Sequence, residues 1–218
     1  MTTQTSLASQ LESKVKDNRE MLPSEAVETM AKATEELGKS GIIDNSLKVG
    51  DKAPDFELSD PTGTQVKLSE LLQSGPVVIN FYRGQWCPYC NLELRAFQQL
   101  LPEFEQIDAQ VIAISPELPD NSLSVKEKHE LAFPVLSDLG NAIARQYGLV
   151  FTLAAELRPL YKGFGIDIAA SNGDDTYELP VPATYVIDTS GTIRYAYANA
   201  DYTLRAEPAA VLEAAKAL

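Results

Sequence analysis

The sequence predicts an α/β protein in which a mixed β-sheet lies between helices, with a helical extension at the N-terminus. Apolar, β-branched runs at residues 77–82 and 109–114 alternate with segments of helical spacing. Two later strand-like segments at 182–188 and 192–197 lie close together in the chain, and a helical segment at 208–218 follows them. Strands that alternate with helices and end in a hairpin imply a mixed sheet that is covered on both faces.

Composition sets the broad class of protein. The chain has 218 residues, of which 44% are hydrophobic, so it is long enough for one sizeable core with about fifty residues left over as an extension. Thirty-one acidic against 18 basic residues give a net charge of −13, which repels nucleic acid and anionic membrane surfaces. No stretch approaches a membrane span and the start lacks a signal peptide, so we expect a cytosolic protein.

Residues 1–46 are predicted to form the helical extension. One helix is expected from Ser6 to about Met21 and a second from Ser24 to Gly38, with Pro23 between them. The second helix carries a narrow apolar stripe on an otherwise polar surface. Such a stripe packs either on its own domain or on a partner subunit, and the second alternative would give a homodimer through the N-terminal helices.

Residues 47–218 are predicted to form the principal domain. In chain order, the expected elements are a hairpin at 56–58 and 65–68, a central strand at 77–82, a helix from Pro88 to about Ile107, a strand at 109–114, a helix at 122–131, a short strand at 133–136, a helix at 141–147, the hairpin at 182–197 and the closing helix. The connection at 152–180 is longer than usual and is either an ordered lid or a plain insertion.

Both cysteines of the chain lie between the central strand and the helix that follows it. Cys87 is expected in the first turn of that helix, where the positive end of the helix dipole favours the thiolate over the thiol. Cys87 is therefore the predicted nucleophile. Cys90 lies three positions on, close enough to attack an adduct at Cys87 and release it as an intramolecular disulfide. The pair is typical of a dithiol/disulfide redox centre.

Other roles for the cysteine pair are less favoured. A structural zinc site takes four ligands, but the chain adds only His129 to the pair, so we expect no metal. His129 itself is expected to be a solvated residue among charged neighbours. A structural disulfide across so short a loop would constrain the unfolded chain little. A third alternative is a non-catalytic scaffold with an incidental thiol pair. The expected exposure of the loop that carries the cysteines argues against it.

The order of the elements resembles the thioredoxin fold, with Cys-x-x-Cys at the start of the first helix after a buried strand and Pro182-x-Thr184 before a later strand. Three segments resemble the peroxiredoxins of the alkyl hydroperoxide reductase and thiol-specific antioxidant family more closely: residues 49–56, 133–138 and 184–194. The resemblance spans about Leu47 to Leu218.

This resemblance implies a thiol peroxidase. The Cys87 thiolate would attack a hydroperoxide and become a sulfenic acid, with which Cys90 would condense. A thioredoxin- or glutathione-linked donor would then reduce the disulfide, so no bound cofactor is required. The alternative is a thioredoxin-like oxidoreductase that exchanges disulfides with proteins and has no peroxidase activity. The Cys-Pro-Tyr-Cys tetrapeptide, familiar from glutaredoxins, slightly favours this alternative.

The sequence departs from the family pattern at two positions. Gly84 stands three residues before Cys87, where typical peroxiredoxins place a Thr or Ser that binds the peroxide. Pro182 stands where they supply an arginine. Thioredoxin-like oxidoreductases hold a proline at this point in cis beside the reactive disulfide, so a cis Pro182 is expected.

Three further residues are candidates for supporting roles. Arg83, four residues before Cys87, would supply positive charge to the thiolate, unless it forms a surface salt bridge. Arg205 is a second candidate for this charge. Trp86 precedes the nucleophile as in thioredoxins, where the ring shapes the substrate surface, and the alternative is a core tryptophan.

Overall fold

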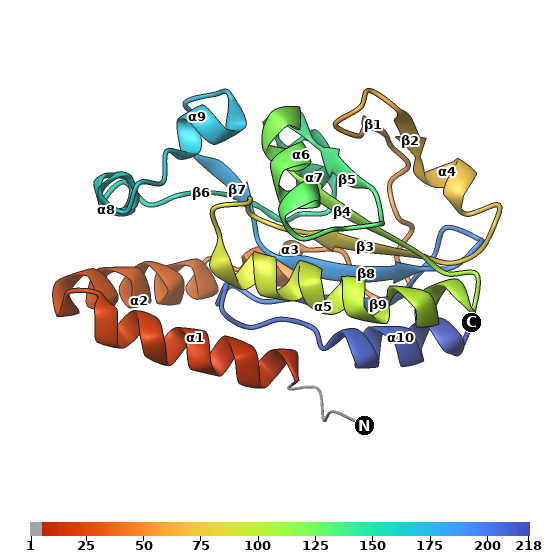
Figure 1. Cartoon of the computed structure of the whole chain (residues 1–218), viewed down its shortest axis with the longest axis horizontal. Helices are drawn as coiled ribbons and strands as arrows, with labels where there is room; N and C mark the ends of the chain where they lie inside the picture. Colours follow the sequence, from red (N-terminus) through yellow and green to blue (C-terminus); the bar gives the residue numbers. More distant parts are fainter. Residues whose placement is uncertain (1–5) are drawn as a thin grey trace.

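The computed structural model describes residues 6–218, so residues 1–5 of the expected extension lie outside it. Its main sheet has seven strands in the order β2-β1-β5-β4-β3-β8-β9 (Figure 1). The strands are β1 (Glu57–Ser59), β2 (Gln65–Lys67), β3 (Val77–Phe81), β4 (Gln110–Ser115), β5 (Val135–Ser137), β8 (Ala183–Ile187) and β9 (Ile193–Ala198). Strands β3, β4 and β5 are parallel, whereas β8 runs antiparallel to β3. The predicted mixed sheet is confirmed.

Helices cover both faces of this sheet. They are α1 (Leu7–Met21), α2 (Ser24–Lys39), α3 (Ile42–Asn45), α4 (Leu68–Leu71), α5 (Pro88–Glu105), α6 (Pro119–Lys128), α7 (Ala142–Gln146), α8 (Leu157–Gly163), α9 (Ile168–Asn172) and α10 (Pro208–Lys216), with a 3₁₀ turn at Leu139–Asn141. Figure 1 shows α5 and α10 side by side along the sheet. None of the helices within residues 6–218 is both long and apolar enough to span a bilayer.

Strand β3 is buried along its whole length and supplies side chains to both halves of the core. Val78 packs on the side of α5 and α10, while Val77 and Ile79 pack on the side of α7. This alternation follows from the two-residue period of a strand. A strand covered on both faces needs a mainly apolar run, which the sequence has at 77–82 with Asn80 as the one polar residue. The strand ends at the loop that carries the cysteines.

The two N-terminal helices pack on the rest of the chain. Leu7 and Leu11 of α1 are buried in the same core as α5, and α2 contacts α8. Asn18 of α1 also donates a 3.0 Å hydrogen bond to the hydroxyl of Tyr89 in α5. Of the two alternatives for the extension, packing on its own domain is therefore confirmed. The homodimer stays a prediction.

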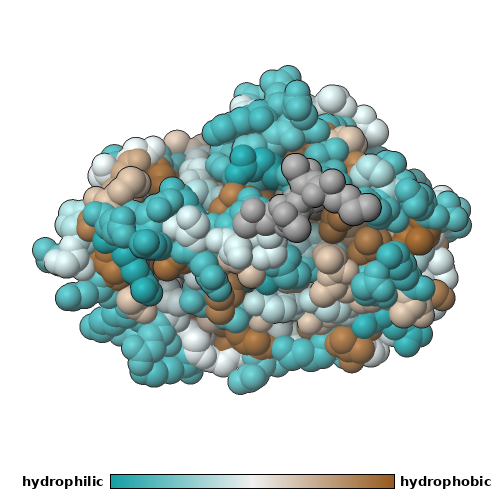
Figure 2. Space-filling view, turned by 60° about the horizontal axis from the view of Figure 1, so that its bottom comes forward, coloured by the Kyte–Doolittle hydropathy of each residue, from teal (hydrophilic) through white to brown (hydrophobic). Residues whose placement is uncertain are grey.

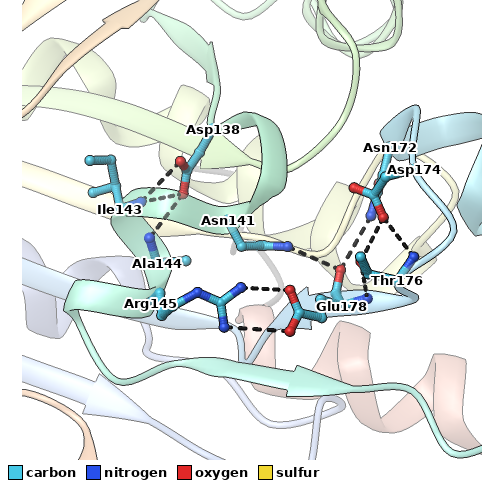
Figure 3. Close-up of polar contacts among 9 residues, drawn as sticks. All are labelled: Asp138, Asn141, Ile143, Ala144, Arg145, Asn172, Asp174, Thr176 and Glu178. Carbon is cyan, nitrogen blue, oxygen red and sulfur yellow. Dashed lines mark hydrogen bonds and ion pairs between the residues drawn. The ribbon is translucent and has the colours of Figure 1, made fainter.

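The segment at 152–180 is ordered and tied to the main domain at its base. It contains α8 and α9 between β6 (Val150–Thr152) and β7 (Glu178–Pro180), which pair with each other. The side-chain amides of Asn141 and Asn172 donate to the backbone oxygen of Glu178 (Figure 3). Arg145 of α7 forms a 2.6 Å ion pair with the Glu178 carboxylate. These contacts fix where the segment leaves and rejoins the domain.

The peptide bond before Pro182 is trans, so the expected cis proline is wrong. Pro182 lies in the short link between β7 and β8, and the preceding residue, Val181, donates to the backbone oxygen of Leu149. The chain therefore continues in an extended path from one strand to the next. A trans bond suits such a path.

The surface matches the acidic composition. On the face shown in Figure 2, hydrophilic residues dominate and hydrophobic ones are dispersed between them. The most exposed large hydrophobic side chain is Met21, at the C-terminal end of α1, with 71% of its surface accessible among the described residues.

Candidate active site

The loop from β3 to α5 places both cysteines at one end of the sheet. Cys87 is the N-cap residue of α5, one position before the first turn in which the sequence predicted it, and Pro88 occupies the first helical position. The backbone N–H of Cys87 donates to the oxygen of Gly84 at 3.1 Å, which closes the loop. Both cysteines are free thiols with at most 1% of their surface exposed. The prediction that this loop is exposed is therefore wrong for the two cysteines.

The two thiols have opposite tendencies to ionise. Burial alone would raise the pKa of Cys87, but a hydrogen bond from the Cys90 thiol and the charges of Arg83 and Arg205 lower it to about 6. Burial raises the pKa of Cys90 well above its usual value, and the neighbouring Cys87 thiolate raises it further. Cys87 therefore carries the negative charge at neutral pH, while Cys90 remains a thiol that donates to it.

Arg83 is buried beside the thiolate in an aromatic cage. Its Nη2 donates a 2.7 Å hydrogen bond to the Tyr161 hydroxyl, and its guanidinium carbon lies 4.4 Å from the centre of the Tyr202 ring and 4.8 Å from that of Trp86. Within residues 6–218 no carboxylate forms an ion pair with it. The alternative prediction, that Arg83 forms a surface salt bridge, is therefore wrong. A buried guanidinium requires a partner, and the Cys87 thiolate is the anion beside it.

Arg205 joins the site from the far end of the sequence. Its Nη2 donates to the Cys90 sulfur at 3.3 Å, and its Nε donates to the Glu93 carboxylate at 2.8 Å. Glu93 was missed by the sequence analysis, although one signal was available. A glutamate on the core face of a helix, three positions after a candidate cysteine, requires a cationic partner.

Gly84 has no room for the side chain that typical peroxiredoxins carry at this position. A Cβ atom there would lie 2.4 Å from Nε1 of Trp86 and 2.9 Å from Oε1 of Glu117. Glu117, also missed from the sequence, is fully buried and accepts a 2.7 Å hydrogen bond from the backbone N–H of Gln85. Burial raises the pKa of its carboxyl to about 8, and the N–H of Gln85 opposes that rise.

Trp86 and Pro182 both lie near Arg83. The Trp86 ring is half-buried and meets Tyr161 edge-on at 5.8 Å. The sequence left open whether the Trp86 ring shapes the substrate surface or lies in the core. A half-buried ring is intermediate between these two alternatives. Pro182 lines a cavity of about 190 Å³ with Arg83 at one side. Within residues 6–218, no three His, Cys, Asp or Glu side chains gather into a group that could hold a metal ion.

The cavity beside Arg83 is mainly apolar. It lies between α2, the inserted segment and the loop after β9, and its apolar walls include Leu37, Phe151, Leu157 and Val181. Arg83, Glu36, Thr34 and Thr152 add polar or charged side chains to its lining. The N-terminal extension and the inserted segment therefore both contribute to the wall of the cavity that Arg83 lines.

Comparisons with known proteins agree on one family. A model of the AhpC/TSA family matches residues 49–196. The chain is 37% identical over 114 residues, 52% of its own length, to a Mycobacterium tuberculosis protein with a peroxiredoxin name, of which the match covers 74%. It is 31% identical over 162 residues to the chloroplastic peroxiredoxin Q of Oryza sativa subsp. japonica, covering 74% of this chain and 64% of that protein.

Solved structures show the same likeness. The crystal structure of the peroxidoxin BcpB from Mycobacterium tuberculosis matches with a TM-score of 0.62 and 28% identity, over 79% of this chain and 98% of that one. A cysteine mutant of peroxiredoxin Q from Xylella fastidiosa shares the fold, with a TM-score of 0.61 at 20% identity over 78% of this chain and 96% of its own. The family model begins at residue 49 and therefore does not cover the N-terminal extension.

Proposed function

Because this chain belongs to the AhpC/TSA family and is a thiol peroxidase, we propose that Cys87 is the nucleophile with which it reduces hydroperoxides. One observation carries this assignment. Arg83 is buried beside Cys87 with no carboxylate partner among residues 6–218, so the pair is arranged as guanidinium and thiolate. An anionic sulfur with a fixed cation next to it is the group that peroxide reduction requires.

The first step is attack of the Cys87 thiolate on the terminal oxygen of the hydroperoxide. The S–O bond forms as the O–O bond breaks, and the sulfur is oxidised to a sulfenic acid. The leaving oxygen takes a proton and departs as water or an alcohol. Positive charge from Arg83, which acts on Cys87, would stabilise the negative charge that develops on the leaving oxygen.

The second step is condensation of Cys90 with the oxidised Cys87. The Cys90 sulfur attacks, the S–O bond breaks, and the hydroxide leaves as water with the proton of the Cys90 thiol. The hydrogen bond between the two cysteines supports this step, because it places the attacking sulfur within reach. A thioredoxin- or glutathione-linked donor then returns the disulfide to the dithiol. Such recycling suits a reducing compartment, and we propose the cytosol.

The cavity beside Arg83 supports organic hydroperoxides as substrates. Its apolar walls match an alkyl chain, and Arg83, whose charge acts on the Cys87 thiolate, lines one side of it. Hydrogen peroxide would leave these walls without a contact. We therefore propose that an alkyl hydroperoxide has the higher kcat/KM.

Disulfide exchange with proteins is the weaker candidate. The relatives carry peroxiredoxin names, which favours the reduction of peroxides over exchange with protein disulfides. A purely structural role is inconsistent with a thiol peroxidase.

A coupled assay tests the proposed function. Thioredoxin, its reductase and NADPH are mixed with the protein and either hydrogen peroxide or an alkyl hydroperoxide, and NADPH consumption is followed. Peroxide-dependent consumption that is lost in Cys87→Ser supports the proposal. Reduction of insulin disulfides with no peroxide-dependent consumption would replace it with disulfide exchange.

A further inference from the structure

A fully buried ion pair lies directly behind the cysteine pair. The Glu93 carboxylate and the Arg205 guanidinium are 2.8 Å apart, and each side chain is 1% exposed. Removing two charges from water carries a penalty that their attraction offsets only with good geometry and further hydrogen bonds. Such a pair is weak evidence for stability alone, so its position next to a reactive group calls for an explanation.

Hydrogen bonds from three parts of the fold hold this pair in place. The hydroxyl of Thr184 in β8 donates to Glu93 at 3.5 Å, and Asn80 in β3 donates to that hydroxyl at 3.2 Å. On the other side, Arg205 Nη1 donates to the backbone oxygens of Tyr202 and Leu204. The remaining nitrogen, Nη2, points to the Cys90 sulfur at 3.3 Å. The guanidinium therefore joins a carboxylate to the resolving sulfur.

We propose, building on the proposed peroxidase function, that Glu93 is a positioning residue that acts through Arg205 and thereby determines which of the two sulfurs carries the negative charge. The two arginines of the site differ in their partners. Arg83 has no carboxylate partner among the described residues, whereas Arg205 is neutralised by Glu93 where it touches Cys90. The uncompensated positive charge therefore lies with Arg83, on the Cys87 side.

This arrangement suits the order of the chemistry. Cys87 must be anionic to attack the peroxide, while Cys90 must wait as a thiol and donate its hydrogen bond to Cys87. Without the carboxylate, the full charge of Arg205 would act on Cys90 at 3.3 Å and draw the negative charge toward it. Two thiolates side by side, or a thiolate on the wrong sulfur, would disturb the first step.

The charge of Glu93, and with it the extent to which Glu93 neutralises Arg205, changes near neutral pH. Burial raises the pKa of Glu93 to about 7, with Arg205 opposing the rise and Cys90 adding to it. The polar and titratable groups that face Glu93 are Cys90 of α5, Asn80 of β3, Thr184 of β8, Tyr195 and Tyr197 of β9, and Arg205 of the loop before α10.

The variant Glu93→Gln tests the proposal. Glutamine keeps an oxygen that accepts from Arg205 Nε but removes the negative charge. Each thiol is titrated alone by its ultraviolet thiolate absorbance, Cys90 in a Cys87→Ser background and Cys87 in a Cys90→Ser background, with the double serine variant subtracted. We expect the thiolate fraction of Cys90 at a fixed pH to rise about tenfold and that of Cys87 to change about threefold or less.

Single-turnover kinetics give a second readout. Trp86 is the only tryptophan and is adjacent to Cys87, so its fluorescence reports the cysteine pair. In Glu93→Gln, the pH profile of disulfide formation should move to lower pH, while that of peroxide attack keeps its midpoint. Glu213→Gln is the matched control, since it breaks an exposed ion pair with Lys216 on α10 and should leave both profiles in place.

If Glu93→Gln does not fold by circular dichroism, Arg205→Lys is used. Lysine keeps the pair with Glu93 but has no second nitrogen to reach Cys90, so the pKa of Cys90 should rise instead of fall. An unchanged Cys90 titration in the variant that folds, or equal shifts of both cysteines, overturns the proposal. The thiol titrations need no peroxide, so they decide this point even where peroxidase activity is absent.

Discussion

Arg83 donates a 2.7 Å hydrogen bond to the hydroxyl of Tyr161, which lies 78 residues further along the chain. This bond joins the loop before the predicted nucleophile to the inserted helix α8. Both side chains are buried, with 2% and 4% of their surface exposed. The insertion therefore completes the cage around Arg83.

Replacing Tyr161 with phenylalanine removes this bond while keeping the ring. Arg83 then loses its hydroxyl acceptor in a buried site, so we expect the free energy of unfolding to fall by about 1–3 kcal/mol, measured by urea denaturation. Peroxidase activity should fall as well, because the guanidinium is less well fixed. Tyr177→Phe, in the same segment, is the control. Equal stability of the two variants would contradict this role.

The rate of peroxide attack should depend on pH through Cys87. The reactive form is the deprotonated one, and the pKa of Cys87 is lowered to about 6, so the rate should rise with pH through this value and level off above it. In Arg83→Gln the thiolate loses a neighbouring cation, and the midpoint should move up by about one pH unit. Stopped-flow measurements of Trp86 fluorescence give both profiles. A midpoint that stays in place would show that Arg83 does not act on the thiolate.

Filling the cavity beside Arg83 should lower the activity toward alkyl hydroperoxides but not that toward hydrogen peroxide. Ala33 of α2 lines this cavity, and Ala33→Phe places a ring where an alkyl chain is proposed to bind. We expect kcat/KM for an alkyl hydroperoxide to fall about tenfold or more, with little change for hydrogen peroxide. Ala210→Phe, at an exposed position of α10, is the control. Equal losses for both peroxides would place the alkyl site elsewhere.

Introducing the usual family residue at Gly84 should harm the protein. The Cβ of Gly84→Ser would meet Trp86 Nε1 at 2.4 Å and Glu117 Oε1 at 2.9 Å, so one of these groups must move. We expect a loss of about 1–3 kcal/mol in the free energy of unfolding, measured by thermal or urea denaturation, and no gain in activity. Higher peroxidase activity in this variant would mean that the loop can adopt the typical arrangement.

The features that local sequence determines were predictable. The apolar run at 77–82 identified the central strand, and the position of Cys87 and Cys90 after it identified the reactive pair. Helical spacing and Pro23 were sufficient to predict α1 and α2. Each of these predictions depends on neighbouring residues, whose pattern is visible in one stretch of sequence.

The features that depend on distant segments were not predictable in this way. Glu93 and Arg205 are 112 residues apart, and only the packing of α5 against β9 and the following loop brings them together. Cys87 is buried in a core cluster to which segments far apart in the sequence contribute, and Tyr202 packs against this cluster. The trans bond at Pro182 follows from the path between β7 and β8, which the residue type alone does not determine.

The most direct test of the central claim uses Cys90→Ser and one equivalent of hydroperoxide. Dimedone traps a sulfenic acid and ignores the three methionines, so intact-mass and peptide analysis locate the oxidised sulfur. The proposed mechanism predicts one dimedone adduct per chain, at Cys87, with no catalytic recycling, and no adduct in Cys87→Ser. No adduct at Cys87, or peroxide turnover by Cys87→Ser, would contradict it.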